Sequence, residues 1–279
     1  MNKVDEINWL RYYRKPPTAS PIKETPFYYG ALNMLYGLSK SGKSRSLAEL
    51  LIKANLHNGE KTIVWLDKDY NIDDKILKIL SHFKHINSDV DNLCKELLER
   101  SHLGEYILIF DSLKDFSTGL DSNADAQKTM EYIRQFTKLG ATVIVIAHAT
   151  KWTSQDGKKS GFKVQGNSET IQSKCDCVFR FEKSESKIQN DNDISITIRK
   201  FIPELMRISN ANTKPILVYD KGGLTKMIHK LIDENNELTH RELKKAVSSS
   251  YSDVIDELKG ETYRIKQVGN KKILEKIIL

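Results

Sequence analysis

The stretch from Gly37 to Ser44 reads Gly-Leu-Ser-Lys-Ser-Gly-Lys-Ser and matches the phosphate-loop pattern G-x-x-x-x-G-K-[S/T]. Glycines let backbone N–H groups turn inward around an anion, and a helix that begins after the loop adds partial positive charge. We expect Lys43 to bind the β- and γ-phosphates of a nucleotide and the Ser44 hydroxyl to bind Mg²⁺. The predicted nucleotide-binding residues are Gly37, Ser39, Lys40, Ser41, Gly42, Lys43, Ser44 and Arg45.

A single carboxylate follows the apolar run from Tyr106 to Phe110, which is typical of a buried strand. Asp111 at the end of such a strand suits the Walker B position, where a carboxylate holds the shell of Mg²⁺ through water. An Asp that merely ends a strand is the alternative, and it loses weight beside a matched phosphate loop. We therefore expect Ser44 and Asp111 together to hold the metal ion of bound Mg-ATP.

The elements that must position these residues form an alternating pattern between Tyr28 and about Tyr219. Short β-branched runs alternate with longer helical periodicities, which predicts an α/β fold with a mostly parallel sheet and crossover helices. After Cys177, shorter alternating stretches predict an antiparallel extension of that sheet. The clearest predicted strands are 32–36, 62–66, 106–110 and 142–147.

The pattern changes beyond Lys221 to Gly223, which reads as a linker. Short helices are predicted at 227–233, 239–247 and 251–259, followed by a basic hairpin that turns at Gly269 and Asn270. This order resembles a winged helix-turn-helix domain, although the acidic third helix would repel DNA phosphates, so a protein partner is an equal alternative. The predicted organisation is an N-terminal arm at 1–27, an ATPase domain at 28–220 and a winged helix-like domain at 224–279.

Over about residues 28–219 the chain resembles the RecA-like ATPases, and within them the plasmid RepA-type and DnaB-like hexameric replicative helicases. The resemblance is most specific in 37–44, in Asp111-Ser112-Leu113, in 147–151 and in 165–168. It implies a RecA-like P-loop core, ATP and Mg²⁺ as cofactors, single-stranded DNA as the partner and a homo-oligomeric, hexameric ring.

In that family, an acidic residue at the end of the strand after the phosphate-loop helix activates the attacking water. The matching segment reads Trp65-Leu66-Asp67-Lys68-Asp69, so the resemblance makes Asp69 the preferred base and Asp67 the reserve. The family residue is usually Glu, and the shorter Asp predicts slow hydrolysis. Stabilising the start of the next helix is the alternative role for Asp69.

The family places a polar γ-phosphate sensor where His148 ends its strand, so the resemblance gives Lys43, Asp69, Asp111 and His148 as the catalytic set; a structural histidine is the alternative. The segment 152–166 corresponds to a loop that lines the DNA channel. We expect phosphate contacts from Lys151, Lys158, Lys159 and Lys163, and base stacking on Trp152 or Phe162.

Ring ATPases of this type also insert a cation from the neighbouring subunit toward the γ-phosphate. The family supplies it from late strands, and the candidates here are Arg199, Lys200 and Arg207. Cys175 and Cys177 lack a partner pair at zinc spacing, so we expect them to pack in the core.

Composition excludes several other classes of protein. With 279 residues, 39% hydrophobic and 29% charged, the chain is neither collagen-like nor wholly disordered. No apolar run approaches the roughly 20 residues of a spanning helix, and the first residues lack a signal-peptide block. Three sparse cysteines favour a reducing compartment, so we expect a cytoplasmic protein without a membrane partner. The net charge of +7 is concentrated in 151–163 and 262–279.

Two function hypotheses follow from these residues. The first is an ATP-hydrolysing, ring-forming motor on single-stranded DNA, a replicative helicase of a plasmid, phage or other mobile element, with a replication protein as the partner of its C-terminal domain. The second is an ATP-switched DNA-binding regulator or recombination mediator that does not unwind DNA. A phosphotransferase is a weaker third alternative.

Overall fold

The structure is a computed structural model that describes residues 19–68, 74–117, 119–154, 160–188, 191–219, 221–246 and 252–277. Its internal contacts divide the chain into two units. One unit extends to Phe181 and takes in residues 201–216, and the other comprises residues 182–200 and 217–279. Each unit is described by itself, and the three-part organisation expected from the sequence stays a prediction.

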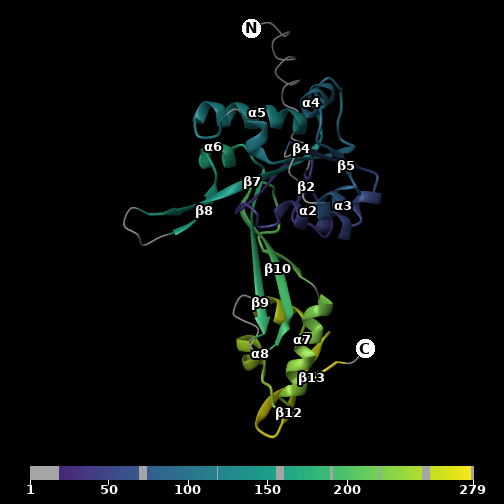
Figure 1. Ribbon diagram of the computed structural model, residues 1–279, viewed down its shortest axis with the longest axis vertical. Helices are drawn as coiled ribbons and strands as arrows, with labels where there is room; N and C mark the ends of the chain where they lie inside the picture. Colours follow the sequence, from purple (N-terminus) through teal and green to yellow (C-terminus); the bar gives the residue numbers. More distant parts are fainter. Residues whose placement is uncertain are drawn as a thin grey trace, which may run out of the picture. The chain divides into compact units, whose positions relative to one another are not determined.

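The first unit is built on a mostly parallel sheet, which confirms the predicted α/β fold class (Figure 1). The strand order is β9-β3-β7-β6-β4-β5, and β3 pairs in parallel with both β7 and β9. β6 pairs in parallel with both β4 and β7. The strands are β3 (Leu32–Gly37), β4 (Thr62–Asp67), β5 (Lys84–Ile86), β6 (Tyr106–Asp111), β7 (Thr142–Thr153), β8 (Ser160–Val164) and β9 (Cys177–Ile188), preceded by the short pair β1 (Ser20–Pro21) and β2 (Tyr28–Tyr29).

Antiparallel strands extend this sheet, as predicted. β8 pairs antiparallel with β7. β10 (Asp191–Met206) is the neighbour of β9 and follows it after only two residues, a connection that permits antiparallel pairing alone. A mostly parallel sheet with such an extension is the RecA-like core that the family resemblance implies.

Helices cover both faces of the sheet because alternate strand residues are apolar on both sides. Met130, Ile133 and Phe136 of α5 share one core with Met34 and Leu108 of the strands. α2 lies on the opposite side of the sheet from α5 in Figure 1. The helices of this unit are α2 (Lys43–Lys53), α3 (Asp74–Leu80), α4 (Val90–Leu98), α5 (Asn123–Lys138) and α6 (Ser168–Ser173), with 3₁₀ turns η1 (Leu56–Asn58) and η2 (Leu113–Phe116).

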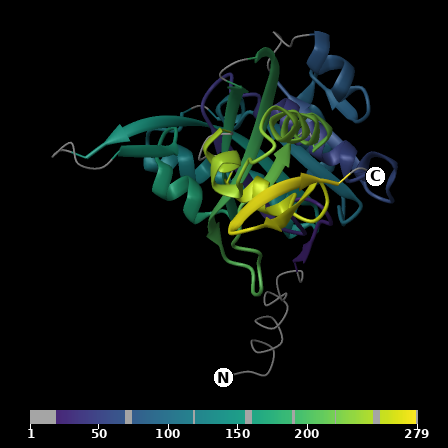
Figure 2. The same ribbon diagram turned by 90° about the horizontal axis from the view of Figure 1, so that it is seen from below.

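The segment 152–166, expected as a long loop, is in large part a β-hairpin. β7 continues to Thr153 and pairs with β8 from Ala149↔Val164 to Thr153↔Ser160. Threonine and aromatic residues favour strands here, and they prolong β7 beyond its buried part. The hairpin extends away from the rest of the first unit in two perpendicular views (Figures 1 and 2).

The second unit has a core of its own, formed by residues that include Leu224, Ile228, Leu243, Ile255 and Tyr263. Three helices and a hairpin occur in the predicted order; the winged-helix assignment itself stays a prediction. The described elements are β11 (Ile216–Tyr219), α7 (Lys221–Glu234), α8 (His240–Ala246), α9 (Ser252–Glu257), β12 (Tyr263–Val268) and β13 (Lys271–Lys276).

Local signals in this unit hold with one exception. The capping box is confirmed, because Thr239 N–H donates to Glu242 Oε2 over 2.9 Å and Glu242 N–H donates to the Thr239 hydroxyl over 3.3 Å. Gly269 turns the hairpin with φ 59°. The expected linker at 221–223 is wrong, since these residues begin α7, where N–H groups lack intrahelical partners and Leu224 anchors the turn. No helix in the described part of the chain has the length and apolarity needed to cross a membrane.

Candidate active site

The phosphate loop joins the end of β3 to the start of α2, the arrangement that an anion site requires. Gly42 precedes the helix with φ 83°, a left-handed conformation that glycine adopts without strain. A Cβ on Gly37 would lie 2.8 Å from the Phe181 carbonyl oxygen, so this position also requires glycine. The sequence therefore placed both glycines for physical reasons that the structure shows.

The ammonium group of Lys43 is turned onto the loop that precedes it. Its Nζ donates to the carbonyl oxygens of Gly37 at 3.0 Å and Leu38 at 2.8 Å. Burial lowers the pKa of Lys43 to about 8, and the negative charge of Asp111 opposes that shift. The side chain is therefore a buried, mostly protonated cation at the mouth of the loop near neutral pH.

The other predicted loop residues divide by exposure. Ser39 and Lys40 are exposed, and Arg45 is held on the surface of α2 by Glu49, at 2.8 Å between Nε and Oε1. The Ser41 hydroxyl oxygen is buried and has no hydrogen-bond partner among the described residues. An unsatisfied hydroxyl inside an anion-binding loop fits a phosphate as its partner.

Strand register brings the remaining polar groups to the same face of the sheet. Asp67 of β4 lies opposite Asp111 of β6, and Gly37 of β3 lies opposite His148 of β7. Paired residues of neighbouring strands point to the same face, and these four all follow the apolar part of their strands. The carboxyl edge of the sheet therefore gathers the acidic and basic groups next to the phosphate loop.

Asp111 is held by two donors. Trp65 Nε1 donates to Asp111 Oδ2 over 3.2 Å, and the Ser44 side chain hydrogen-bonds the same carboxylate. Burial raises the pKa of Asp111 to about 6, and the nearby Asp67 adds to that shift, whereas both hydrogen bonds and Lys43 oppose it. Asp111 is therefore a carboxylate whose charge is costly until a cation approaches.

These groups suit a magnesium nucleotide. A hydroxyl and a carboxylate are the hard oxygen ligands that Mg²⁺ prefers, and Ser44 and Asp111 already lie within hydrogen-bonding distance of each other. Lys43 supplies a full positive charge, and the Ser41 hydroxyl supplies a further donor to phosphate oxygens. The residues present therefore fit both the nucleotide and its metal ion.

The two candidate bases have different outcomes. Asp69, the preferred one, lies outside the described residues. Asp67, the reserve, is 4% exposed and faces His85 of β5, with 3.4 Å between its Oδ2 and Nε2 of the imidazole. Burial lowers the pKa of His85, and Asp111 opposes that shift. The structure thus brings Asp67 and His85 to the site, and which Asp is the base stays a proposal.

Sequence reasoning missed Trp65 and His85. Trp65 precedes Asp67 by two residues and so shares its face, a signal present in the alternation of the strand. His85 carried no such signal, because β5 has only three residues and no period can be read from it.

His148 lies where the parallel part of β7 gives way to the hairpin. Its carbonyl oxygen accepts a hydrogen bond from Gln165 N–H over 2.8 Å, which fixes the start of the hairpin next to the residue opposite Gly37. The predicted sensor thus lies between the phosphate loop and the hairpin. Its sensing role stays a proposal.

The hairpin carries basic and aromatic residues on both of its faces. Trp152 is opposite Gly161 and shares a face with Lys163, whereas Lys151 is opposite Phe162 on the other face. Trp152 is 38% exposed and its indole lies over Gly161. Both described lysines are exposed, and Lys158 and Lys159 lie outside the described residues. The predicted basic cluster is therefore divided, with one lysine and one aromatic ring on each face.

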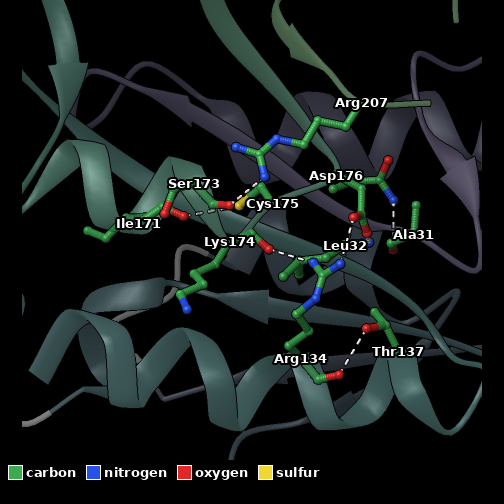
Figure 3. A network of polar contacts seen from close by, with 11 residues as sticks. Ala31, Leu32, Arg134, Thr137, Ile171, Ser173, Lys174, Cys175, Asp176 and Arg207 are labelled. Atoms are coloured by element: carbon green, nitrogen blue, oxygen red, sulfur yellow. Dashed lines mark hydrogen bonds and ion pairs between the residues drawn. The ribbon is translucent and has the colours of Figure 1, made fainter. Parts of the chain in front are cut away.

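Arg207, a candidate for the cation donated to a neighbouring subunit, belongs to a network at the amino ends of the strands (Figure 3). Its Nη1 donates to the Ser173 carbonyl over 2.7 Å, and its N–H donates to the Asp176 carbonyl over 2.9 Å. The Asp176 carboxylate accepts from Leu32 N–H and from Arg134 Nη2, each over 2.8 Å. Since Leu32 begins β3, Arg207 lies at the end of the sheet opposite its own phosphate loop.

Arg199 and Lys200 are both half-buried residues of the second unit. The choice of the donated cation among the three candidates stays a prediction.

The two neighbouring cysteines are buried, as expected for core residues. Cys175 and Cys177 are both 0% exposed, and burial raises the pKa of each thiol. The Cys175 thiol donates to the Ile171 carbonyl over 3.5 Å. The described residues contain no group of three His, Cys, Asp or Glu side chains arranged to hold a metal ion.

The sequence matches no protein-family model and no curated protein. Among solved structures, the chain is similar to one described as the ATPase domain of a DnaB-like helicase. The identity is 11%, the similarity covers 77% of this chain and 92% of that chain, and the TM-score is 0.47. The nucleotide site is accordingly argued from the residues and register of this chain.

Proposed function

We propose that this protein is an ATP-hydrolysing, ring-forming motor on single-stranded DNA, a replicative helicase of a plasmid, phage or other mobile element. The observation that carries the ATPase proposal is the meeting of three side chains at the carboxyl edge of one sheet. Lys43 and Ser44 begin α2, and Asp111 ends β6 within hydrogen-bonding distance of Ser44.

The chain's own residues divide the work of hydrolysis. The loop amides and Lys43 bind and orient the phosphates, which lowers the entropic cost of reaction. Bound Mg²⁺ supplies charge stabilisation to the phosphate oxygens. Asp69, or Asp67 in its place, accepts a proton from water, and His148 links the phosphate loop to the hairpin.

The hairpin of β7 and β8 supports the DNA part of the proposal. It begins one residue after His148 and presents exposed Trp152 beside Lys163. Single-strand binders combine base stacking on aromatic rings with cations along the phosphate backbone. We propose that this hairpin grips single-stranded DNA and moves when the nucleotide state changes.

Two assays test this proposal. Mg-ATP hydrolysis should be stimulated by single-stranded DNA and lost in Lys43→Ala, and a forked duplex should be unwound only with hydrolysable ATP. Arg45→Ala is the matched control, because Arg45 follows the loop but is paired with Glu49 on the surface. Particle images with a non-hydrolysable analogue, with and without an oligonucleotide, test the ring.

The second candidate, an ATP-switched DNA-binding regulator, is favoured by the separate core of the second unit and its exposed hairpin. Several basic side chains of that hairpin are already paired within the unit: Arg264 and Lys266 with Glu275, Lys271 with Glu237, and Lys276 with Asp233. Such pairing reduces the charge offered to DNA, and a replication protein is then the better partner for this surface. Duplex binding through 262–279 without unwinding would establish the regulator instead.

A further inference from the structure

Trp65 has an unusual position for an indole, because its polar atom points at a carboxylate of the proposed active site. Nε1 donates to Asp111 Oδ2 over 3.2 Å, and the side chain is 0% exposed. The ring stacks on Phe83 with 5.8 Å between centroids and 28° between planes. Packing therefore fixes the direction of the N–H group.

Strand register explains why this contact forms. Trp65 lies opposite Ile109, and Asp111 is two residues further along the same face of β6. A diagonal neighbour on an adjacent strand is within reach of an aromatic side chain. A buried indole N–H also requires an acceptor, and the Asp111 carboxylate provides it.

The contact has a consequence for the carboxylate. Asp67 lies opposite Asp111, and its charge disfavours a second negative charge there. Donors from β4 and α2, Trp65 and Ser44, hold the Asp111 side chain from two sides. Without the indole donor, the carboxylate can rotate away from the charge of Asp67 and from Ser44.

We propose that Trp65 is a positioning residue for Asp111, whose indole N–H keeps the carboxylate turned toward Ser44 and the metal ion of the nucleotide. This inference rests on the proposed function, because it concerns the same Mg-ATP site. It assigns the orientation of the metal-binding carboxylate to a buried side chain that contacts neither nucleotide nor metal.

The test measures how much Mg²⁺ tightens nucleotide binding. Calorimetry gives the Kd of adenylyl imidodiphosphate in Mg²⁺ and in EDTA, and the ratio of the two is compared between wild type and Trp65→Phe. We expect the ratio to fall about tenfold, the size of one hydrogen bond to a charged group, with the Kd in EDTA within about twofold of wild type. Phe83→Leu is the matched control: it loosens the same ring packing, keeps the donor and should keep the ratio.

A double-mutant cycle separates positioning from packing. In an Asp111→Asn background, Trp65→Phe should leave the ratio unchanged, because there is no carboxylate left to orient. Benzothienylalanine in place of Trp65 keeps the ring volume and replaces N–H by sulfur, so it gives the same answer if the Phe variant does not fold.

An unchanged ratio in the donor-free variants, with normal Mg-dependent binding by wild type, overturns the inference alone. A ratio that falls equally in the Asp111→Asn background also overturns it, since Trp65 would then act without Asp111. A wild-type protein that binds no nucleotide under either condition refutes the proposed function and the inference together.

Discussion

Replacing Asp111 with Asn should make the metal-free protein more stable while it abolishes hydrolysis. Burial and the neighbouring Asp67 raise the pKa of Asp111 from 3.8 to about 6, against the hydrogen bonds from Ser44 and Trp65. A shift of about 2 units corresponds to about 3 kcal/mol at 1.36 kcal/mol per unit. Because the amide oxygen still accepts hydrogen bonds, though more weakly, we expect a gain of about 1–3 kcal/mol above pH 6.

The gain should depend on pH in a definite direction. Below about pH 4 the folded and unfolded states both carry the proton, so the charge costs nothing. Between about 4 and 6 the folded state retains a proton that the unfolded chain has released, and wild-type stability falls as pH rises through this window. The advantage of Asp111→Asn should therefore be absent at pH 4 and complete just above pH 6.

Thermal melts in EDTA between pH 4 and 7 test this prediction, with about 2–4 °C expected for each kcal/mol. Asp121→Asn is the matched control, because it removes a carboxylate from an exposed position and should change stability by no more than about 0.5 kcal/mol. The reasoning is refuted if Asp111→Asn melts below wild type at pH 7, or if its advantage is the same at pH 4 as at pH 7.

Three further variants test other parts of the structure. Gly37→Ala places a Cβ 2.8 Å from the Phe181 carbonyl oxygen, so denaturant unfolding should show a loss of about 1–3 kcal/mol; wild-type stability would contradict the close approach. Trp152→Ala should weaken binding of an oligo-dT about 5- to 100-fold in fluorescence anisotropy at fixed salt, whereas Trp152→Phe keeps a stacking face; equal affinities would remove this ring from the DNA contact. Arg134→Ala leaves the Asp176 carboxylate without its guanidinium partner and should cost about 1–3 kcal/mol in the same unfolding assay, and Arg134→Lys should recover only part; an unaltered midpoint would show that the pair is solvent-screened.

Much of the fold was predictable because it is written in local periods. The buried strands that end at Gly37 and Asp111 are continuous apolar runs, and the phosphate loop contains both of its special glycines. The capping box at Thr239 and the turn at Gly269 likewise depend on residues close in sequence. Such features need no knowledge of the tertiary structure.

The rest of the site depends on which strands are neighbours. Trp65 meets Asp111 only because β4 and β6 are adjacent and in a particular register, and sequence periodicity does not contain that pairing. His85 reaches Asp67 from a three-residue strand that is too short for any pattern. The hairpin was read as a loop for a related reason, since its antiparallel pairing begins where the buried apolar run ends.

The two carbonyl bonds of the Lys43 ammonium have a final consequence for selectivity. A ligand that recruits this cation must replace interactions at 3.0 Å and 2.8 Å that the loop already provides, so arrival is an exchange of partners and not a gain from bare solvent. A polyphosphate chain repays that exchange through many oxygens at once, whereas a single small anion offers few. The self-satisfied loop thus acts as a threshold that favours long phosphate chains over the orthophosphate released after turnover.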